Sequence, residues 1–311
     1  MNEILVSAII TTHNRSALLE RAIKSVQIQS YENIELIVID DASDHIHRKK
    51  NEELAKNVVY HYISKEESQG GNYARNVGIE MSSGALLAFL DDDDVWDPAK
   101  IEKQVARYQA THFEVIGCGQ NRITVKNGII LYRSSIVKEG EGGKDFSEVI
   151  FRGPPFVTSE LMITRDALIS VGEFDVTLKA WQEYDLLIRL SDQYVFGCVE
   201  ETLVDYYEDL SSTNRLSNKL DVFLYSFPII EEKYRERISS LPLQLRIGWR
   251  KLFLRECLHR STNKSERKGY RKQLFFLEKS FKNLAFYILN PDPKNEYVEY
   301  ARRLRNMIID K

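Results

Sequence analysis

The sequence predicts an α/β fold in which a mostly parallel sheet is flanked by helices. Short apolar runs alternate with segments of helical periodicity through the first hundred residues, and acidic residues directly follow two of these runs. Strands and helices that alternate with short links typically build parallel sheets. After residue 216 Gly becomes rare and helical patterns dominate, so we expect a helical extension behind the α/β domain.

Four apolar runs in the first part are expected to be strands, and the segments between and after them to be helices. The strands are residues 4–10, 34–40, 58–64 and 85–90, and the helices are 15–29, 72–83, closed by Gly84, and 99–109. In open α/β sheets ligands bind beyond the carboxyl ends of the strands. The acids at 40–41 and 91–94 both follow such ends, which predicts that they face one site.

The middle of the chain is less regular. Alternating residues around Asn127-Gly128 predict a hairpin with its turn there, followed by a flexible loop at 138–145. A further helix is expected at 181–193. We predict two domains, 1–215 and 216–311.

Bulk composition suits a globular protein of one large domain or two smaller ones. The chain has 311 residues, 43% of them hydrophobic, and no apolar run reaches the roughly 18 residues of a membrane-spanning helix. The first apolar run lacks a basic leader and a cleavage site, so we expect a strand and a cytoplasmic protein. The three cysteines are far apart and fit buried thiols better than a disulfide or zinc site (Cys118, Cys198 and Cys257).

The net charge of −3 hides an asymmetry. Residues 216–311 carry 21 Lys and Arg against 11 Asp and Glu, whereas residues 1–215 carry 22 against 35. An acidic first part and a basic second part predict two functional surfaces.

The stretch FLDDDDVWDP (89–98) places four carboxylates in a row after an apolar run. Like charges so close repel one another, and solvent, a basic partner or a divalent cation could compensate them. One or two acids in a loop are commonly just solvated. Four of them, with a second pair at Asp40-Asp41, favour Mg²⁺ or Mn²⁺, which take carboxylate and phosphate oxygens as ligands. A metal here would in turn attract a diphosphate.

Six segments in order resemble the family 2 glycosyltransferases, which have a GT-A fold. They are VSAIITTHNR (6–15), IELIVIDDAS (34–43), GGNYARNVGI (70–79), FLDDDDVWDPAKIEKQ (89–104), SVGEFDVTL (170–178) and WQEYDLLIRL (181–190). The resemblance covers residues 4–210. It implies inverting transfer of a single sugar from a UDP-sugar to an acceptor hydroxyl, with Mn²⁺ or Mg²⁺. It also implies that the acceptor is a growing surface glycan, free or lipid-linked, of the capsule, lipopolysaccharide or teichoic type.

The same resemblance assigns nucleotide-sugar contacts to the first two motifs. In TTHNR, Thr11 and His13 match positions that meet the uracil, His13 by stacking, and Asn14 and Arg15 belong to the same binding motif. Asp41 matches the acid that accepts from the uracil N3–H.

Within the acid run, Asp91 and Asp93 give the D-x-D spacing of the family's metal ligands, with Asp93 the foremost. Asp92 is expected to meet the ribose. Arg75, in ARNVGI, is expected near the diphosphate, and a structural ion pair is an equal alternative.

The catalytic base is expected in WQEYDLLIRL. Many relatives carry (E/Q)-D-x-D-L-W-L-R-L with the first Asp as base, and here Glu183 falls where that Asp is usual. A carboxylate can remove the proton of the acceptor hydroxyl. Glu183 is preferred to Asp185, which stands four residues before Arg189 and fits an ion pair on one helix face. Glu is one methylene longer than the Asp usual at this position, so the geometry of proton removal would differ slightly. A share in proton removal for Asp185 therefore stays open. Trp181 is assigned to the acceptor, with simple packing as the alternative.

The basic second part mixes Lys and Arg with aromatic residues (Trp249, Phe253, Phe275, Phe276, Phe281 and Phe286). Basic amphipathic helices bind anionic membranes, which would place the protein at the inner face of the cell membrane. Packing between helices or formation of a homodimer is the alternative. Nucleic acid is not expected, because no binding motif is present and the acidic first part opposes it.

Two rival functions share the acidic pattern. A metal-dependent phosphatase or nucleotidyltransferase would release phosphate or pyrophosphate rather than UDP. A non-catalytic homologue that binds sugar or nucleotide would keep the fold without turnover, since fold alone does not decide function.

Overall fold

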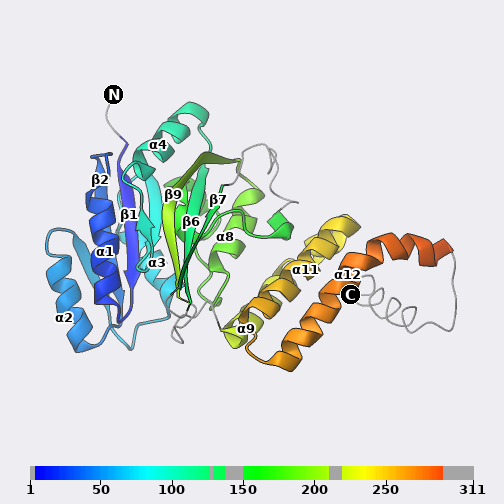
Figure 1. Ribbon diagram of the computed structural model, residues 1–311. Coiled ribbons are helices and arrows are strands. Elements are labelled where there is room, and N and C mark those ends of the chain that lie inside the picture. Colours follow the sequence, from blue (N-terminus) through cyan, green and yellow to red (C-terminus); the bar gives the residue numbers. More distant parts are fainter. Residues whose placement is uncertain (1–3, 127–128, 137–149, 210–218, 290–311) are drawn as a thin grey trace. The chain divides into compact units, whose positions relative to one another are not determined.

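The computed structural model describes residues 4–126, 129–136, 150–209 and 219–289 (Figure 1). The chain divides into two compact units. The first comprises Met1–Ile150 and Pro154–Asn214, and the second comprises Phe151–Gly153 and Arg215–Lys311.

The first unit begins with the predicted alternation of strands and helices. Its elements are β1 (Val6–Thr12), α1 (Ser16–Gln27), β2 (Ile34–Asp41), α2 (His45–Leu54), β3 (Val59–Ile63), α3 (Gly71–Met81) and β4 (Leu86–Asp91). Strand β1 pairs in parallel with both β2 and β4, and β2 pairs in parallel with β3. The four strands therefore end at one edge of the sheet, and the predicted mostly parallel sheet is confirmed.

The remaining strands continue the sheet in mixed directions. The elements are β5 (Val95–Trp96), α4 (Lys100–Thr111), β6 (Val115–Lys126), β7 (Ile129–Ser135), the short helices η1 (Ile150–Arg152) and η2 (Thr158–Glu160), β8 (Met162–Thr164), α7 (Arg165–Ser170), α8 (Gln182–Ser191) and β9 (Phe196–Asp209). The strand order is β3-β2-β1-β4-β8-β6-β9-β5, and β7 pairs with β6. Strand β8 runs antiparallel to β4, whereas β6 and β9 are parallel.

Helix α2 is a helix that the apolar pattern does not predict. Its sequence, HIHRKKNEEL, has no apolar stripe, and Asn51 is its buried residue. The Asp44 side chain caps it by accepting from the backbone N–H groups of Ile46 (3.1 Å) and His47 (3.0 Å). A polar helix of this kind forms through its cap and its backbone propensity, which periodicity does not report.

Gly84 does not close α3 as expected, because the helix ends at Met81. A Cβ atom on Gly84 would lie 2.5 Å from Ser7 Oγ and 2.8 Å from Leu5 O. Glycine is needed here because the chain passes close to β1 on its way into β4.

The β6–β7 hairpin agrees with the prediction in its pairing. Lys126 lies opposite Ile129, which leaves a two-residue connection at Asn127-Gly128. That connection and the predicted loop at 138–145 lie outside the described residues. The three cysteines are buried and unbonded, as expected.

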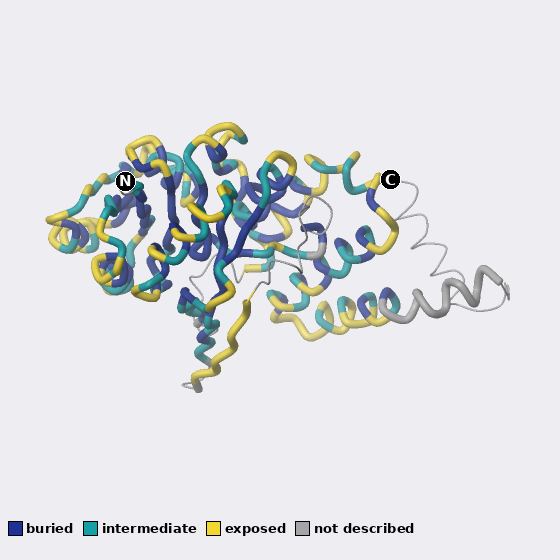
Figure 2. The backbone as a smooth tube through the Cα atoms, turned by 90° about the horizontal axis from the view of Figure 1, so that it is seen from above, coloured by how far each residue is buried: buried dark blue, intermediate teal, exposed yellow. Residues whose placement is uncertain are grey.

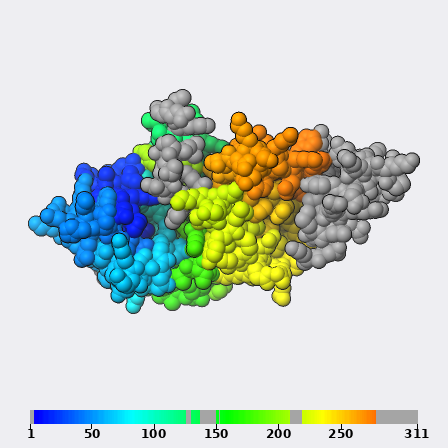
Figure 3. Space-filling view, turned by 90° about the horizontal axis from the view of Figure 1, so that it is seen from below, coloured from blue at the N-terminus to red at the C-terminus, as the bar shows by residue number. Residues whose placement is uncertain are grey.

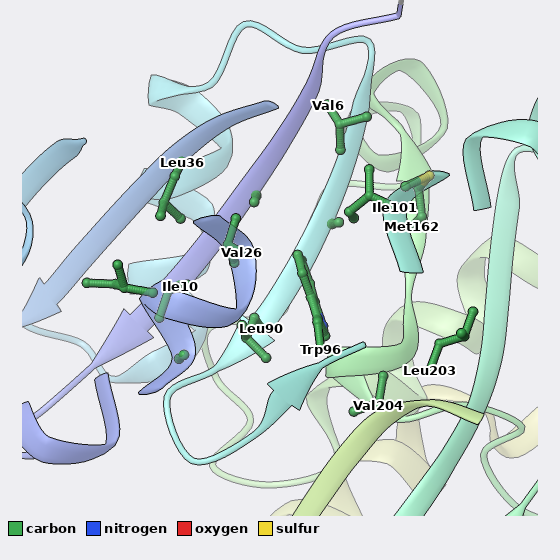
Figure 4. Packing of buried hydrophobic residues seen from close by; sticks show 14 of the residues in the cluster. Val6, Ile10, Val26, Leu36, Leu90, Trp96, Ile101, Met162, Leu203 and Val204 are labelled. Carbon is green, nitrogen blue, oxygen red and sulfur yellow. The ribbon is translucent and has the colours of Figure 1, made fainter. Parts of the chain in front are cut away.

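Alternate residues of the central strands form the core of the first unit (Figure 4). Val6 and Ile10 of β1 and Leu90 of β4 point to the side on which Val26 of α1 and Ile101 of α4 pack. Residues two apart on a strand share a face, so β1 and β4 present matching apolar rows to these helices. The core fixes the register, and the register fixes which residues end each strand.

The second unit is built from helices, as expected. They are α9 (Leu220–Lys233), α10 (Arg235–Ser240), α11 (Leu243–Arg260) and α12 (Lys264–Leu289). Leucines 254, 274 and 277 join α11 to α12, which lie side by side in yellow and orange in Figure 3. None of the described helices is long and apolar enough to cross a membrane.

Aromatic packing accounts for part of the second unit. The Trp249 ring stacks on Phe227 with 4.7 Å between ring centroids, and Phe253 lies 4.6 Å from Phe227. The packing alternative therefore holds for Trp249 and Phe253. Phe275 is half exposed and lies 5.9 Å from Phe276. The side chains of Phe281 and Phe286 lie outside the described residues.

A glycine of β6 provides a test of the core. A Cβ atom on Gly117 would overlap the buried Phe156 ring. We expect Gly117→Ala to lower the free energy of unfolding by about 1–3 kcal/mol, because the ring must leave its position. Thermal and chemical unfolding followed by circular dichroism measures this. Gly269→Ala is the control, since this exposed position of α12 has nothing within 4 Å besides the helix's own backbone, and it is expected to be neutral or stabilising by up to about 1 kcal/mol. Equal stability of the two variants would contradict the packing described.

Candidate active site

The two predicted groups of acids flank the end of β1. Thr12 is paired with Asp40 of β2, and Thr11 is paired with Asp91 of β4. Both groups therefore lie at the carboxyl edge of the sheet, as predicted from the strand ends. Thr11 occupies the position between them.

The residues Asp91, Asp92, Asp93 and Asp94 form a turn, here called the acidic turn. The Asp94 N–H donates to Asp91 O (3.0 Å), which closes it. Asp91, Asp93 and Asp94 each offer a carboxylate oxygen, and these oxygens lie within 4.8 Å of one another. Such a set of hard oxygen ligands could hold Mg²⁺ or Mn²⁺.

Two arginines predicted to bind the donor contact the acidic turn. Arg75 of α3 donates from Nη2 to Asp91 Oδ1 (2.5 Å). Arg15 donates from Nη1 to Asp92 Oδ1 (3.1 Å) and lies 3.5 Å from Asp93 Oδ2. The two guanidinium groups compensate part of the turn's negative charge, and Arg75 makes the ion pair given as its alternative role.

Asp92 is the buried member of the turn that faces β1. The Thr12 hydroxyl donates to Asp92 Oδ2 (2.7 Å). Burial raises the pKa of the Asp92 carboxyl to about 6, with Asp93 adding to the rise and Arg15 opposing it. Asp92 is therefore less accessible than Asp91 and Asp93.

Asp94 is fully buried and held by two donors. Ser159 Oγ donates to Asp94 Oδ2 (2.6 Å), and the Tyr207 N–H donates to Asp94 Oδ1 (3.2 Å). The Ser159 hydroxyl also accepts from the Asp91 N–H (3.2 Å), and Ser159 O accepts from Trp96 Nε1 (2.9 Å). Ser159 thus ties both ends of the acidic turn to η2.

Arg21 supports the turn from α1. Its Nη2 donates to Asp93 O (2.5 Å), and its guanidinium carbon lies 3.9 Å from the centre of the Tyr207 ring. The sequence motifs give no individual role to Arg21, Ser159 or Asp94. Arg21 lies within an ordinary helical pattern and Ser159 in an irregular stretch, so only Asp94, within the acid run, gave a signal.

Asp40 is closed by protein donors. Its Oδ1 accepts from the Ser43 N–H (3.0 Å), and its Oδ2 accepts from Asn51 Nδ2 (2.7 Å) and Tyr60 Oη (2.8 Å). Burial and the neighbouring Asp40 carboxylate raise the pKa of the Tyr60 hydroxyl, which keeps it a donor. These contacts leave Asp40 a structural role at the end of β2.

Asp41 differs from its neighbour in one respect. The residue is 8% exposed, and its Oδ1 atom is buried without a hydrogen-bond partner. A buried acceptor without a partner costs free energy, and functional sites are where such atoms are retained. The arrangement fits an N–H donor brought by a ligand.

His13 and Asn14 form a fixed pair beside Asp41. Asn14 Oδ1 accepts from the Asp44 N–H (2.7 Å), so its Nδ2 points to His13 Nε2 (3.1 Å). Nε2 is then an acceptor, and the proton resides on Nδ1, which donates to Asp41 O (2.5 Å). These two contacts hold the imidazole ring in one orientation.

Backbone strain marks the same loops. Asn14 (φ 55°) and Ala42 (φ 60°) adopt the left-handed region, and the Asn14 N–H donates to Ser43 Oγ (2.8 Å). Residues other than Gly enter this region at a cost, and such strain is concentrated at functional sites.

Helix α8 carries the residues predicted for catalysis. Asp185 is fully buried and forms an ion pair with Arg189 (2.9 Å), whose Nη atoms donate to Val171 O (2.5 Å) and Glu173 O (2.6 Å). Asp185 therefore anchors the helix to the preceding turn. Glu183 lies half-buried in the first turn, directly after Trp181 and Gln182.

Trp181 packs at the start of α8. It adopts a left-handed backbone (φ 63°), and its ring lies 4.9 Å from Tyr184 in an edge-to-face arrangement. Only 8% of the residue is exposed, so most of its surface is used for packing, which was the alternative to acceptor contact.

Helix α3 links the approach to α8 with the acidic turn. Asn72 Nδ2 donates to Asp175 O and Leu178 O, both at 2.8 Å. On the same helix Arg75, which pairs with Asp91, lies 5.6 Å from the centre of the Phe174 ring. The segment that leads into α8 is therefore fixed to the helix that reaches the acidic turn.

The chain belongs to glycosyl transferase family 2. The sequence model of that family, described as "Glycosyl transferase family 2", matches residues 7–170, which is more than half of the chain. The protein is accordingly a glycosyltransferase, and the predicted family and enzyme class are confirmed.

Several relatives are named for the synthesis of bacterial glycans. The GalNAc(5)-diNAcBac-PP-undecaprenol beta-1,3-glucosyltransferase of Campylobacter jejuni is 38% identical over 29% of this chain and 29% of its own length. WcaA of Escherichia coli, a putative colanic acid biosynthesis glycosyl transferase, is 28% identical over 62% of this chain and 68% of its own. An uncharacterized glycosyltransferase of Nostoc is 27% identical over 68% of this chain and 67% of its own. An uncharacterized glycosyltransferase of Rickettsia conorii is matched over only 33% of its length.

Solved structures share the GT-A fold at low sequence identity. S. aureus TarS in complex with UDP-GlcNAc superposes with a TM-score of 0.56 at 13% identity, over 90% of this chain and 92% of that one. The mannosyltransferase PcManGT of Pyrobaculum calidifontis, in complex with GDP-Man and Mn²⁺, gives 0.53 at 13% identity over 99% and 81%. These likenesses support the predicted fold.

Asp40 and Asp41 allow a matched test of the site. In Asp40→Asn an amide N–H₂ replaces one carboxylate oxygen and faces either the Ser43 N–H or the Asn51 and Tyr60 donors, so we expect a loss of about 1–3 kcal/mol in the free energy of unfolding. In Asp41→Asn no contact of Oδ1 is lost, and the change is expected to stay within about 0.5 kcal/mol. Urea unfolding of both variants gives the comparison. A larger loss in Asp41→Asn would show that Asp41, rather than Asp40, holds the strand end.

Proposed function

We propose that this glycosyltransferase moves a single sugar from a UDP-sugar to an acceptor hydroxyl with inversion at the anomeric carbon. The observation that carries the proposal is the combination at one sheet edge of a buried, unpartnered carboxylate oxygen with three clustered carboxylates. The first suits a nucleobase N–H, and the second suits a divalent cation with a diphosphate. A phosphatase has no need of the base contact.

Asp41 is proposed to recognise uracil. Uracil carries an N–H at N3, whereas cytosine has an acceptor there, so a carboxylate oxygen at this position favours UDP over CDP. The His13 ring, held by Asn14 and by Asp41 O, is proposed to stack on the base, and Thr11 at the end of β1 is proposed to contact it. The names of similar proteins agree, since TarS was solved with UDP-GlcNAc and the E. coli relative WfgD is named a UDP-Glc-dependent glucosyltransferase. PcManGT was solved with GDP-Man, so the base requires a direct test.

Asp93 and Asp91 are proposed to hold the metal, with an oxygen of Asp94 within reach of both. A bound Mn²⁺ or Mg²⁺ would supply positive charge to the leaving diphosphate. Arg15 and Arg75 add positive charge beside these acids, and Asp92 is proposed to contact the ribose. Arg21 and Ser159 hold the acidic turn and act as positioning residues.

Glu183 is proposed as the catalytic base. The contacts of Asp185 with Arg189 commit that acid to holding the helix, which leaves Glu183 as the carboxylate for chemistry. Glu183 accepts the proton of the acceptor hydroxyl while the oxygen of that hydroxyl bonds to the anomeric carbon, and the bond from that carbon to UDP breaks on the opposite side. An α-linked donor then gives a β-linked product.

The acceptor is proposed to be a glycan or a lipid-linked glycan. The C. jejuni relative and WfgD are named for undecaprenol-linked acceptors, and WcaA for colanic acid synthesis. Trp181 is proposed to contact the acceptor through the small part of its surface that is exposed. Binding of the basic helices to an anionic membrane, at the cytoplasmic face, and formation of a homodimer remain predictions from the sequence.

The function is tested by UDP release from a panel of UDP-sugars with Mn²⁺. We expect the wild type to release UDP from one donor, and Asp93→Ala or removal of metal with EDTA to abolish release. Glu183→Gln is expected to lower kcat by about 10²–10⁴-fold while the affinity for UDP is kept. Asp185→Asn is the matched control, because Asp185 is assigned to holding the helix and not to proton removal. The broken ion pair is expected to lower the free energy of unfolding by roughly 3 kcal/mol.

Three outcomes would decide against the proposal. Release of phosphate or pyrophosphate would favour the phosphatase or nucleotidyltransferase. Binding of UDP-sugar without turnover in the wild type would favour the non-catalytic homologue. Absence of UDP binding would overturn the choice of donor.

A further inference from the structure

Strands β6, β7 and β9 form a three-stranded ribbon with two chemically different faces. In this ribbon β6 is central, antiparallel to β7 and parallel to β9. Residues that lie opposite one another share a face, and the face alternates along each strand. One face, here called the ribbon face, carries Asn121, Ile123, Tyr132, Ser134, Asp205 and Tyr207.

The ribbon face lies on the side of the acidic turn. The Arg21 guanidinium that donates to Asp93 O stacks on the ring of Tyr207, a ribbon-face residue. Val95, which follows the turn directly, is paired with Asp205. A molecule that reaches the acidic turn from this side would therefore cross the ribbon face.

The ribbon face consists of a polar row and an apolar row. In the polar row Asn121 Nδ2 donates to Asp205 Oδ1 (3.1 Å), and Ser134 Oγ donates to Asn121 Oδ1 (2.9 Å). Asn carries two amide N–H groups and the contact with Asp205 uses one, so the row keeps further donor and acceptor capacity. In the next row Ile123 lies between Tyr207 and Tyr132.

The apolar row is open to solvent at its outer end. Tyr132 is 72% exposed on β7, whose residues 130–135 are all exposed (Figure 2). Rows two residues apart are separated by about 7 Å, and three strands span about 10 Å. This area is the size of one or two sugar rings, which have hydroxyls at the rim and an apolar C–H face.

The opposite face differs in character. Its central residues form a closed set in which Thr124 Oγ1 donates to Glu208 (3.3 Å) and Arg122 lies 4.0 Å from the same carboxylate. Arg122 also lies 5.1 Å from the centre of the Tyr206 ring. Its polar groups are paired with one another, so the ribbon face is the one suited to a neutral polar ligand.

We propose that the ribbon face binds the carbohydrate acceptor. A sugar ring lies with its C–H face on Tyr132 and its hydroxyls on Asn121 and Asp205. The neighbouring sugar of the same glycan then approaches the acidic turn. The proposal rests on the proposed sugar transfer, and it assigns the substrate class and the residues of the acceptor side.

The test measures how acceptor sugars stimulate UDP release. The probes are the octyl β-glycosides of glucose, galactose, N-acetylglucosamine and N-acetylgalactosamine, given with the UDP-sugar that the wild type uses. We expect at least one glycoside to stimulate the wild type, and Tyr132→Ala and Asn121→Ala to raise its KM by about 5- to 10-fold. Calorimetric titration with UDP checks that the nucleotide site of each variant is intact.

Leu131→Ala is the matched control. Leu131 is the neighbour of Tyr132, is 56% exposed, and points to the opposite face of the ribbon. Its glycoside KM is expected to stay at the wild-type value. A wild type that releases UDP but responds to no glycoside, or a Tyr132→Ala variant with unchanged KM, overturns the acceptor face alone. A wild type that releases no UDP overturns the proposed function, and this proposal with it.

Discussion

Six carboxylates meet at the carboxyl edge of three neighbouring parallel strands, and the rest of the site depends on how their repulsion is compensated. They are Asp40, Asp41, Asp91, Asp92, Asp93 and Asp94. Their positions follow from the register of β1 with β2 and β4, which the apolar core of alternate residues fixes. Because like charges in a partly buried place destabilise the fold, each acid needs a donor, a cation or a ligand.

The protein compensates these acids unequally. Asp40 and Asp94 are buried and fully engaged by donors of neighbouring elements, and they hold the strand end and the acidic turn. Asp91 is paired with Arg75, and Arg15 lies beside both Asp92 and Asp93. Asp41 keeps a buried oxygen without a partner, and the clustered oxygens of the acidic turn suit a cation. Asp40, whose two oxygens are closed by protein donors, is the acid to which we assign no ligand, whereas Asp41 and the more exposed Asp91 and Asp93 are assigned to nucleotide and metal.

The sequence was sufficient for the parallel sheet, its acidic edge and the helical extension, because these follow from local periodicity and strand ends. Helix α2 was missed because its cap, and not an apolar stripe, defines it. The family motifs supplied the roles expected of Asp41, Asp93 and Glu183. Ser159 and Arg21 could not be predicted, because their importance arises from contacts 65 and 72 residues away along the chain. The unpartnered oxygen of Asp41 is likewise a property of packing alone.

A crystal structure of the protein with UDP and Mn²⁺ tests this account most directly. The account predicts that the uracil N3–H donates to Asp41 Oδ1 and that the metal lies on Asp93 and Asp91. It also predicts that Asp40 and Asp94 keep their present protein partners. The account is contradicted if Asp41 Oδ1 stays without a ligand contact, or if nucleotide and metal bind away from this edge of the sheet.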